Sequence, residues 1–419
     1  MRTVLVTGPG GAGRTTVAAA TALAAAAEGR RVLLLTRDRD TAPDAVLGTT
    51  LSAASDAPDG GRTPWGPPVE AAPGLWAARI ATGEHFRALA RDLQDRGASL
   101  FDLLGADPLD PEELTELPGA EPLAVLAALR AAHAAPGGPD LLVVDMPPVH
   151  ETVRLLALPE QLSRYLRRLL PAERQAARAL RPMLAQLAGV PMPAQRLYET
   201  AERLQEELAA VQRVIDAPGT TVRLAAEPGP AAARALRTAR AGLALQGCRV
   251  DALVANRLLP DGSTDPWLAD LAAEQHAAHK TLRDDFLADG VPVVALPHLG
   301  RAPHGPGDLA ELARAAVRAG GDGLAGGLDT EARSPAPEVE DRLATDSLLI
   351  WRIPLPGAER GTLGLVRRGD ELIVEVGPFR RVLTLPSALR RCTVAGAGLR
   401  DGALCVRFAP DPGLWPRTP

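Results

Sequence analysis

The sequence predicts an α/β protein in which a parallel sheet carries an inserted helical subdomain and is followed by a small all-β sandwich. The first half alternates short apolar runs with alanine-rich helical stretches, the order expected of a parallel sheet covered by helices. Near the middle, helical periodicity continues without strands. The last segment has short strand-like runs separated by Gly, Pro and Asp, which is typical of an antiparallel sandwich.

The predicted central strands are short, apolar and followed by a turn or a polar residue, as buried parallel strands usually are. They are Thr3–Thr7, Val32–Thr36, Leu141–Asp145, Val222–Ala225, Ala252–Ala255 and Val293–Leu296. The helical insertion is predicted over about residues 155–217, where amphipathic runs such as LYETAERLQEELAAVQRVI occur.

Changes of composition place the domain boundaries. The sheet domain is predicted over residues 1–312. Residues 313–345 include GGDGLAGGLDTEARSPAPEVE, whose Gly, Pro and acidic residues favour a flexible linker. The sandwich is predicted over residues 346–410, with strands running from LLIWRIPL to ALCVRFA.

The composition disfavours several classes of function. Hydrophobic residues make up 46% of the 419 residues, and the net charge of −5 gives no electrostatic reason to expect a nucleic acid as partner. We expect no stable membrane insertion, because no charge-free apolar run reaches the length of a membrane span and no signal-peptide pattern opens the chain. The three cysteines lack CxxC spacing, so a reducing, cytoplasmic location is predicted.

A glycine-rich loop follows the first predicted strand. GPGGAGRTT, residues 8–16, has the spacing G-x-x-x-x-G-K-[ST] with arginine in place of lysine. In a strand-to-helix loop of this kind, backbone N–H groups surround phosphates and the first hydroxyl suits Mg²⁺. The alternative is a glycine-rich turn without a ligand. The predicted phosphate-binding residues are Gly8, Gly10, Gly11, Ala12, Gly13, Arg14, Thr15 and Thr16.

Two carboxylates follow predicted strands and strengthen this interpretation. Asp38 follows the second strand, and Asp145 ends the strand LLVVD. A carboxylate at the end of such a strand can reach Mg²⁺ or its water. Taken alone, either acid is more often a solvated loop residue or a helix cap, but the loop and both acids in this order are far more specific and indicate a nucleotide site.

With these residues in view, the chain resembles the ArsA family of anion-pump and tail-anchored-protein-targeting ATPases, relatives of the MinD and ParA group. The family's GKGGVGKTT is matched by GPGGAGRTT, its STDPAH by TRDRDT from Thr36, and its DTAPTGHT by DMPPVHET from Asp145. The segment VANRLLP is similar to the family segment whose asparagine contacts adenine, here Asn256. The resemblance covers residues 1 to about 312.

The resemblance implies a P-loop NTPase fold that binds ATP and Mg²⁺. It implies that Asp38 activates the attacking water, and that Thr15 and Asp145 hold the metal or its water. It also implies a dimer, formed either by two copies of this chain or with an ArsA-like paralogue.

The matched motifs differ from the family at the positions that handle phosphate. The family's second loop residue is a lysine that reaches the partner's phosphates, whereas Pro9 supplies neither a charge nor an N–H. Arg14 replaces the loop lysine with a planar guanidinium, although Lys280 is the only lysine in the chain and so a single replacement carries little weight. His150 and Glu151 stand where Gly and His are usual. We therefore expect ATP hydrolysis to be weak or lost.

The remaining segments indicate what the nucleotide site serves. The tail resembles the small heat-shock-protein-like domain appended to bacterial ArsA homologues, which favours a chaperone-like role. Met183 and Met192 could line a groove for an apolar client, although ordinary core packing is the simpler interpretation.

His276 and His279 are too few for a metal site. The helical segment has no cysteine, which disfavours arsenite transport.

Three hypotheses remain open. The first is an ArsA-like, nucleotide-linked chaperone or client-binding factor. The second is a non-catalytic interaction scaffold, or a partner of an intact ArsA-like paralogue. The third is a positioning ATPase of the ParA or MinD type, which usually needs a membrane-targeting helix or a basic DNA-binding face, and the sequence shows neither.

Overall fold

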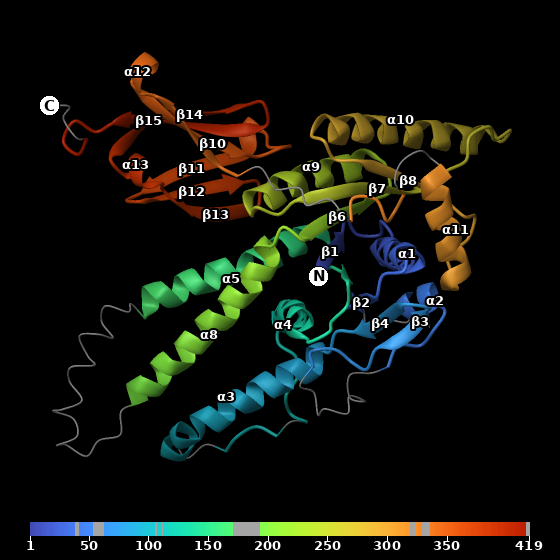
Figure 1. Cartoon of the computed structure of the whole chain (residues 1–419), viewed down its shortest axis with the longest axis horizontal. Coiled ribbons are helices and arrows are strands. Elements are labelled where there is room, and N and C mark those ends of the chain that lie inside the picture. The colour runs from blue at the N-terminus through green and yellow to red at the C-terminus, as the bar shows by residue number, and fades with distance from the viewer. Residues whose placement is uncertain are drawn as a thin grey trace.

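An eight-stranded, mostly parallel sheet forms the centre of the first domain in the computed structural model (Figure 1). The structure describes residues 1–37, 42–52, 63–104, 107–110, 112–170, 193–318, 323–328 and 336–415. The strand order is β3-β4-β2-β5-β1-β6-β7-β8, and all neighbours pair in parallel except β3 with β4. The strands are β1 Arg2–Thr7, β2 Val32–Thr36, β3 Val69–Ala72, β4 Leu75–Arg79, β5 Leu141–Asp145, β6 Thr220–Ala226, β7 Val250–Leu258 and β8 Val293–Pro297.

Helices cover both faces of this sheet. On one face α1 packs against α2 and α11, and on the other α4, α8, α5, α9 and α10 follow one another, with α3 beside α4 (Figure 1). Each face has its own buried core of aliphatic side chains. The helices are α1 Arg14–Ala27, α2 Ala42–Leu47, α3 Thr82–Leu104, α4 Ala120–Ala134, α5 Val149–Leu169, α8 Pro193–Asp216, α9 Pro230–Leu245, α10 Pro266–Ala288 and α11 Gly305–Arg318.

All six strands predicted for the sheet are confirmed, and five of them are buried along their predicted length. The sixth, β8, lies at the edge of the sheet, and its first three residues are only half-buried. The antiparallel edge pair β3 and β4 was not predicted. Its burial pattern is mixed, with Glu70 and Trp76 exposed, so the sequence has no continuous apolar run there.

The helix that leads into the predicted insertion is α5, which starts at Val149. Its first turns pack on the sheet through the buried Val153 and Leu156. Its later turns lie beside α8, which extends away from the sheet (Figure 1). Met183 and Met192 lie outside the described residues.

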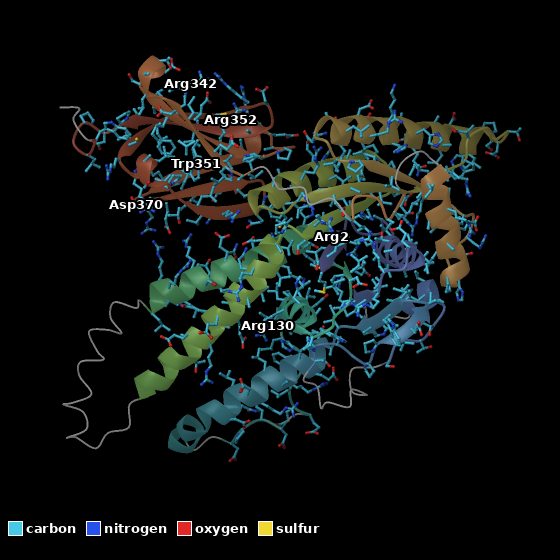
Figure 2. The ribbon with its side chains drawn as sticks, viewed as in Figure 1. Arg2, Arg130, Arg342, Trp351, Arg352 and Asp370 are labelled. Carbon is cyan, nitrogen blue, oxygen red and sulfur yellow. The ribbon has the colours of Figure 1, made fainter. Side chains whose placement is uncertain are left out.

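Two antiparallel sheets form the C-terminal sandwich. One has the order β14-β15-β10-β9 and the other β11-β12-β13. Figure 2 shows Trp351 of β10 within it, where this side chain is only 4% exposed. The elements are β9 Glu338–Arg342, α12 Leu343–Asp346, β10 Leu348–Pro354, β11 Leu363–Arg368, β12 Glu371–Val376, β13 Phe379–Thr384, α13 Ser387–Arg390, β14 Cys392–Arg400 and β15 Ala403–Pro410.

Residues 313–345 contain structured pieces where a flexible linker was expected. α11 continues to Arg318, and β9 joins the sandwich. Between them Leu324 and Leu328 are buried in the core beneath α1 and α11. The guanidinium of Arg223 anchors this turn, because it donates hydrogen bonds to the carbonyls of Leu324 and Gly326 while pairing with Asp251 at 3.2 Å.

The sandwich packs against the sheet domain through a continuous hydrophobic core. Phe379 is inserted against α9 at Gly242, where an added Cβ would lie 2.4 Å from the ring. The same ring stacks on His150 of α5 at 5.9 Å between centroids. Arg381 binds Glu160 at 3.0 Å and the Leu245 carbonyl at 2.8 Å. The first turn of α5 and the sandwich therefore contact each other directly.

Replacing Phe379 with alanine should destabilise the protein by about 3–5 kcal/mol, because the ring is only 4% exposed and leaves a cavity between the domains. Urea unfolding followed by circular dichroism measures this loss. The matched control is Val366→Ala on β11, where the side chain is 59% exposed and the change should stay within about 0.5 kcal/mol. Equal effects of the two substitutions would show that the ring does not join the domains.

Candidate functional site

The carboxyl ends of four neighbouring strands converge on the glycine-rich loop. β5, β1, β6 and β7 are adjacent and parallel, so the residues that follow them lie at one edge of the sheet. Ligands of open parallel sheets bind at such an edge. The glycine-rich loop, residues 8–13, joins β1 to α1 there.

Two glycines of the loop are required by its packing. A Cβ on Gly8 would lie 1.9 Å from the Ala225 carbonyl oxygen at the end of β6. Gly13 is the N-cap of α1 and has a left-handed conformation with φ of 78°, and a Cβ there would lie 2.3 Å from the Asn256 amide nitrogen. Gly10 and Gly11 instead face open space within 4 Å. The loop is therefore closed against the protein and open on its outer side.

The predicted metal-binding pair is brought together. The Thr15 hydroxyl, in the first turn of α1, donates a hydrogen bond of 2.6 Å to the Asp145 carboxylate at the end of β5. Asp145 is only 5% exposed. A hydroxyl and a carboxylate are oxygen ligands of the kind that Mg²⁺ prefers. The pair fits the metal that the sequence predicts.

Arg14 is directed toward the turn after β5. Its guanidinium donates a hydrogen bond of 2.6 Å to the Met146 carbonyl. The same turn is fixed to the glycine-rich loop by a bond of 3.0 Å from the Val149 N–H to the Gly8 carbonyl. The hydroxyls of Thr7 and Thr152 both donate to the Pro147 carbonyl. Arg14 thus takes part in joining the two loops.

His150 and Glu151, which stand in DMPPVHET where the family pattern has Gly and His, have different surroundings. His150 stacks on Phe379 of the sandwich, and Glu151 lines a second cavity of about 500 Å³ between α5 and the sandwich. Asp38, predicted to activate water, lies outside the described residues. The preceding Arg37 is described, and it pairs with Glu121 at 2.6 Å.

Asn256 and Arg257, near the end of β7, contact the glycine-rich loop through consecutive side chains. The Asn256 amide is 4% exposed and donates to the Ala12 carbonyl at 3.0 Å. Arg257 donates to the Gly11 carbonyl, also at 3.0 Å. The sequence analysis named Asn256 but missed Arg257, and the charge next to Asn256 in VANRLLP is the signal that could have found it.

A cavity of about 780 Å³ adjoins the loop and has the size of a small-molecule site. Thr15, Thr16, Asn256 and Arg257 contribute to its wall. The end of β8 and the turn after it, with Pro297 and Pro303, form another part of the wall. Other lining residues are Val46, Glu227, Leu259, Leu271, Glu274, Gln275, His298, Leu299 and Arg301.

Other candidate ligands are placed apart from this loop. His276 contacts the Leu259 carbonyl at 3.0 Å and Asp261 at 2.7 Å, so it holds a loop in place. Within the described ranges, no group of three His, Cys, Asp or Glu side chains is arranged to hold a metal ion. Over the same ranges, no helix combines the length and hydropathy needed to cross a bilayer.

Gly8→Ala should destabilise the protein by about 1–3 kcal/mol, because the new methyl group overlaps the Ala225 carbonyl. Gly10→Ala is the matched control, since the same substitution in the same loop meets nothing within 4 Å. Thermal unfolding of the two variants beside the natural chain measures the difference. Equal stability of the two variants would contradict the close contact of Gly8 with the Ala225 carbonyl.

Two families of known proteins match this chain. Residues 1–317 match the family described as anion-transporting ATPase, and residues 346–408 match the HSP20-like domain found in ArsA. The first match covers the sheet domain with its glycine-rich loop, and the second lies within the sandwich.

Relatives cover almost the whole chain. An uncharacterized protein of Streptomyces coelicolor is 55% identical over 418 residues and covers 100% of both chains. A protein of Mycobacterium tuberculosis is 34% identical over 442 residues, with 99% of this chain and 97% of its own covered. A putative arsenical pump-driving ATPase of Aquifex aeolicus is 26% identical over 401 residues, with 93% and 95% covered. The chain belongs to the ArsA anion-transporting ATPase family and has its C-terminal HSP20-like domain.

Proposed function

We propose that this chain binds ATP with Mg²⁺ at the glycine-rich loop and uses the nucleotide as a switch, with hydrolysis that is weak or lost. The observation that carries this proposal is the hydrogen bond of 2.6 Å between Thr15 and Asp145, which places two magnesium-type ligands beside a glycine-rich loop at a helix N-terminus. The adjoining cavity of about 780 Å³ has room for the nucleoside. Members of the family bind ATP and Mg²⁺.

Slow hydrolysis follows from what the loop lacks. Pro9 has no charge and no N–H to offer a phosphate. Arg14 donates to the Met146 carbonyl and has a guanidinium where the family has a compact ammonium. If each lost transition-state contact is worth about 3 kcal/mol, losing two slows turnover by roughly four orders of magnitude.

The proposed switch acts on an apolar protein client. Support comes from the HSP20-like match of the sandwich and from exposed apolar side chains on the helices that extend from the sheet. Leu93 of α3 is 68% exposed and Leu169 of α5 is 77% exposed. We propose that the working form is a dimer, either of two copies or with an intact ArsA-like paralogue that supplies the lysine missing at Pro9.

The thiols of this chain do not favour a metalloid as ligand. Thiolates bind soft metals and thiols do not. Burial raises the pKa of the Cys248 thiol to about 12, so this sulfur stays protonated at neutral pH. Burial also raises the pKa of Cys392, which lies in the sandwich. These two thiols give no support to arsenite as a ligand, and a nucleotide is the ligand we propose.

The test is binding of a fluorescent ATP analogue to the purified chain with and without Mg²⁺. Saturable binding that weakens when Mg²⁺ is removed supports the proposal, and Thr15→Val should abolish the magnesium effect because it removes the hydroxyl and keeps the shape. Turnover should rise by orders of magnitude in a Pro9→Lys plus Arg14→Lys variant.

The alternative is a non-catalytic interaction scaffold. The Arg14 contact favours it, since a guanidinium bound to the Met146 carbonyl holds two loops together without any nucleotide. Absence of saturable binding by both the natural chain and the double-lysine variant would overturn the nucleotide proposal and leave the scaffold.

A further inference from the structure

Arg257 has an unusual backbone conformation next to the glycine-rich loop. Its φ is 57°, and within the described ranges only Arg257, Ser347 and Asp401 combine a positive φ with a side chain. The left-handed region disfavours residues that have a Cβ, and such conformations concentrate at functional sites. A register shift between β7 and β8 falls at the same point, between Ala255 and Leu258.

This backbone turns two consecutive side chains toward one loop. Consecutive residues of a regular strand point to opposite faces, and a bulge redirects them. Asn256 reaches the Ala12 carbonyl and Arg257 reaches the neighbouring Gly11 carbonyl, both at 3.0 Å. The irregularity therefore brings a guanidinium against the loop and into the wall of the adjoining cavity.

The charge of Arg257 is held by a weak partner. Glu227, which follows β6, accepts from Arg257 at 3.3 Å, and the two side chains are 45% and 50% exposed. Exposed pairs of this kind contribute little and exchange readily with other charges. Both residues line the 780 Å³ cavity. Arg301, the other arginine in the wall, is bound at 2.6 Å to Asp308.

We propose that Arg257 is a phosphate-binding residue, which exchanges the Glu227 carboxylate for the polyphosphate of a bound nucleotide. A polyphosphate carries more negative charge than one carboxylate, and a guanidinium matches phosphate oxygens with two parallel donors. In the glycine-rich loop itself, Pro9 has no charge and the guanidinium of Arg14 is bound to the Met146 carbonyl. Arg257 thereby supplies a positive charge to this loop from the same chain. This inference rests on the proposed nucleotide site.

The experiment measures the affinity of the full-length chain for the fluorescent ATP analogue with Mg²⁺. Arg257→Gln should weaken binding on the order of ten- to a hundredfold, the effect of one charge-assisted hydrogen bond. Arg257→Lys should recover part of this loss. Glu227→Gln should tighten binding several-fold, because it frees Arg257. If the ion pair were purely structural, the Arg257 and Glu227 substitutions would not change the affinity in opposite directions.

Two further variants separate folding from binding. Arg257→Gly removes the side chain at a position where glycine relieves the left-handed strain, so it should fold at least as stably as the natural chain and still bind weakly. Arg283→Gln on α10, an arginine that is 52% exposed away from the cavity wall, should bind as the natural chain does.

The outcomes distinguish the two proposals. If the natural chain binds the analogue and the Arg257→Gln and Arg257→Gly variants bind it with the same affinity, the proposed role of Arg257 is wrong. The proposed nucleotide site is then unaffected. Equal loss in both Arg257→Gln and Glu227→Gln also overturns it, since the pair would then be only structural. No saturable binding by the natural chain overturns the proposed function and this inference together.

Discussion

The close approach of the glycine-rich loop to the neighbouring strand ends is the constraint on which the rest of the site depends. Gly8 packs so tightly against the Ala225 carbonyl that no side chain fits. With this contact in place, the loop turns sharply and α1 begins at Arg14 with Thr15 facing the end of β5. The loop conformation therefore follows from backbone packing.

The turn after β5 connects this loop to the sandwich. On one side, the Val149 N–H binds the Gly8 carbonyl. On the other, His150 stacks on Phe379, which fills the space left by Gly242 on α9. Because α5 begins between these contacts, its first turn links the glycine-rich loop to the sandwich. The HSP20-like domain is thus a packed part of this molecule.

Charge at the loop is distributed differently from what the motif alone indicates. The carboxylate and hydroxyl of Asp145 and Thr15 keep the arrangement suited to a divalent cation. The positive charge of Arg14 is used to bind a main-chain carbonyl, while that of Arg257 lies at the cavity with an exposed carboxylate as its partner.

The sequence by itself determined the parallel strands and the glycine-rich loop, because short buried runs and loop spacing are local properties. It also determined the pairing of Thr15 with Asp145, because the carboxyl ends of adjacent parallel strands lie at the same edge of the sheet. Only the tertiary structure decided the partner of Arg14, the left-handed Arg257 and the contact of Phe379 with α5 and α9. Each of these joins residues that are far apart in the chain, and their geometry depends on strand register and domain packing, which leave no pattern in the local sequence.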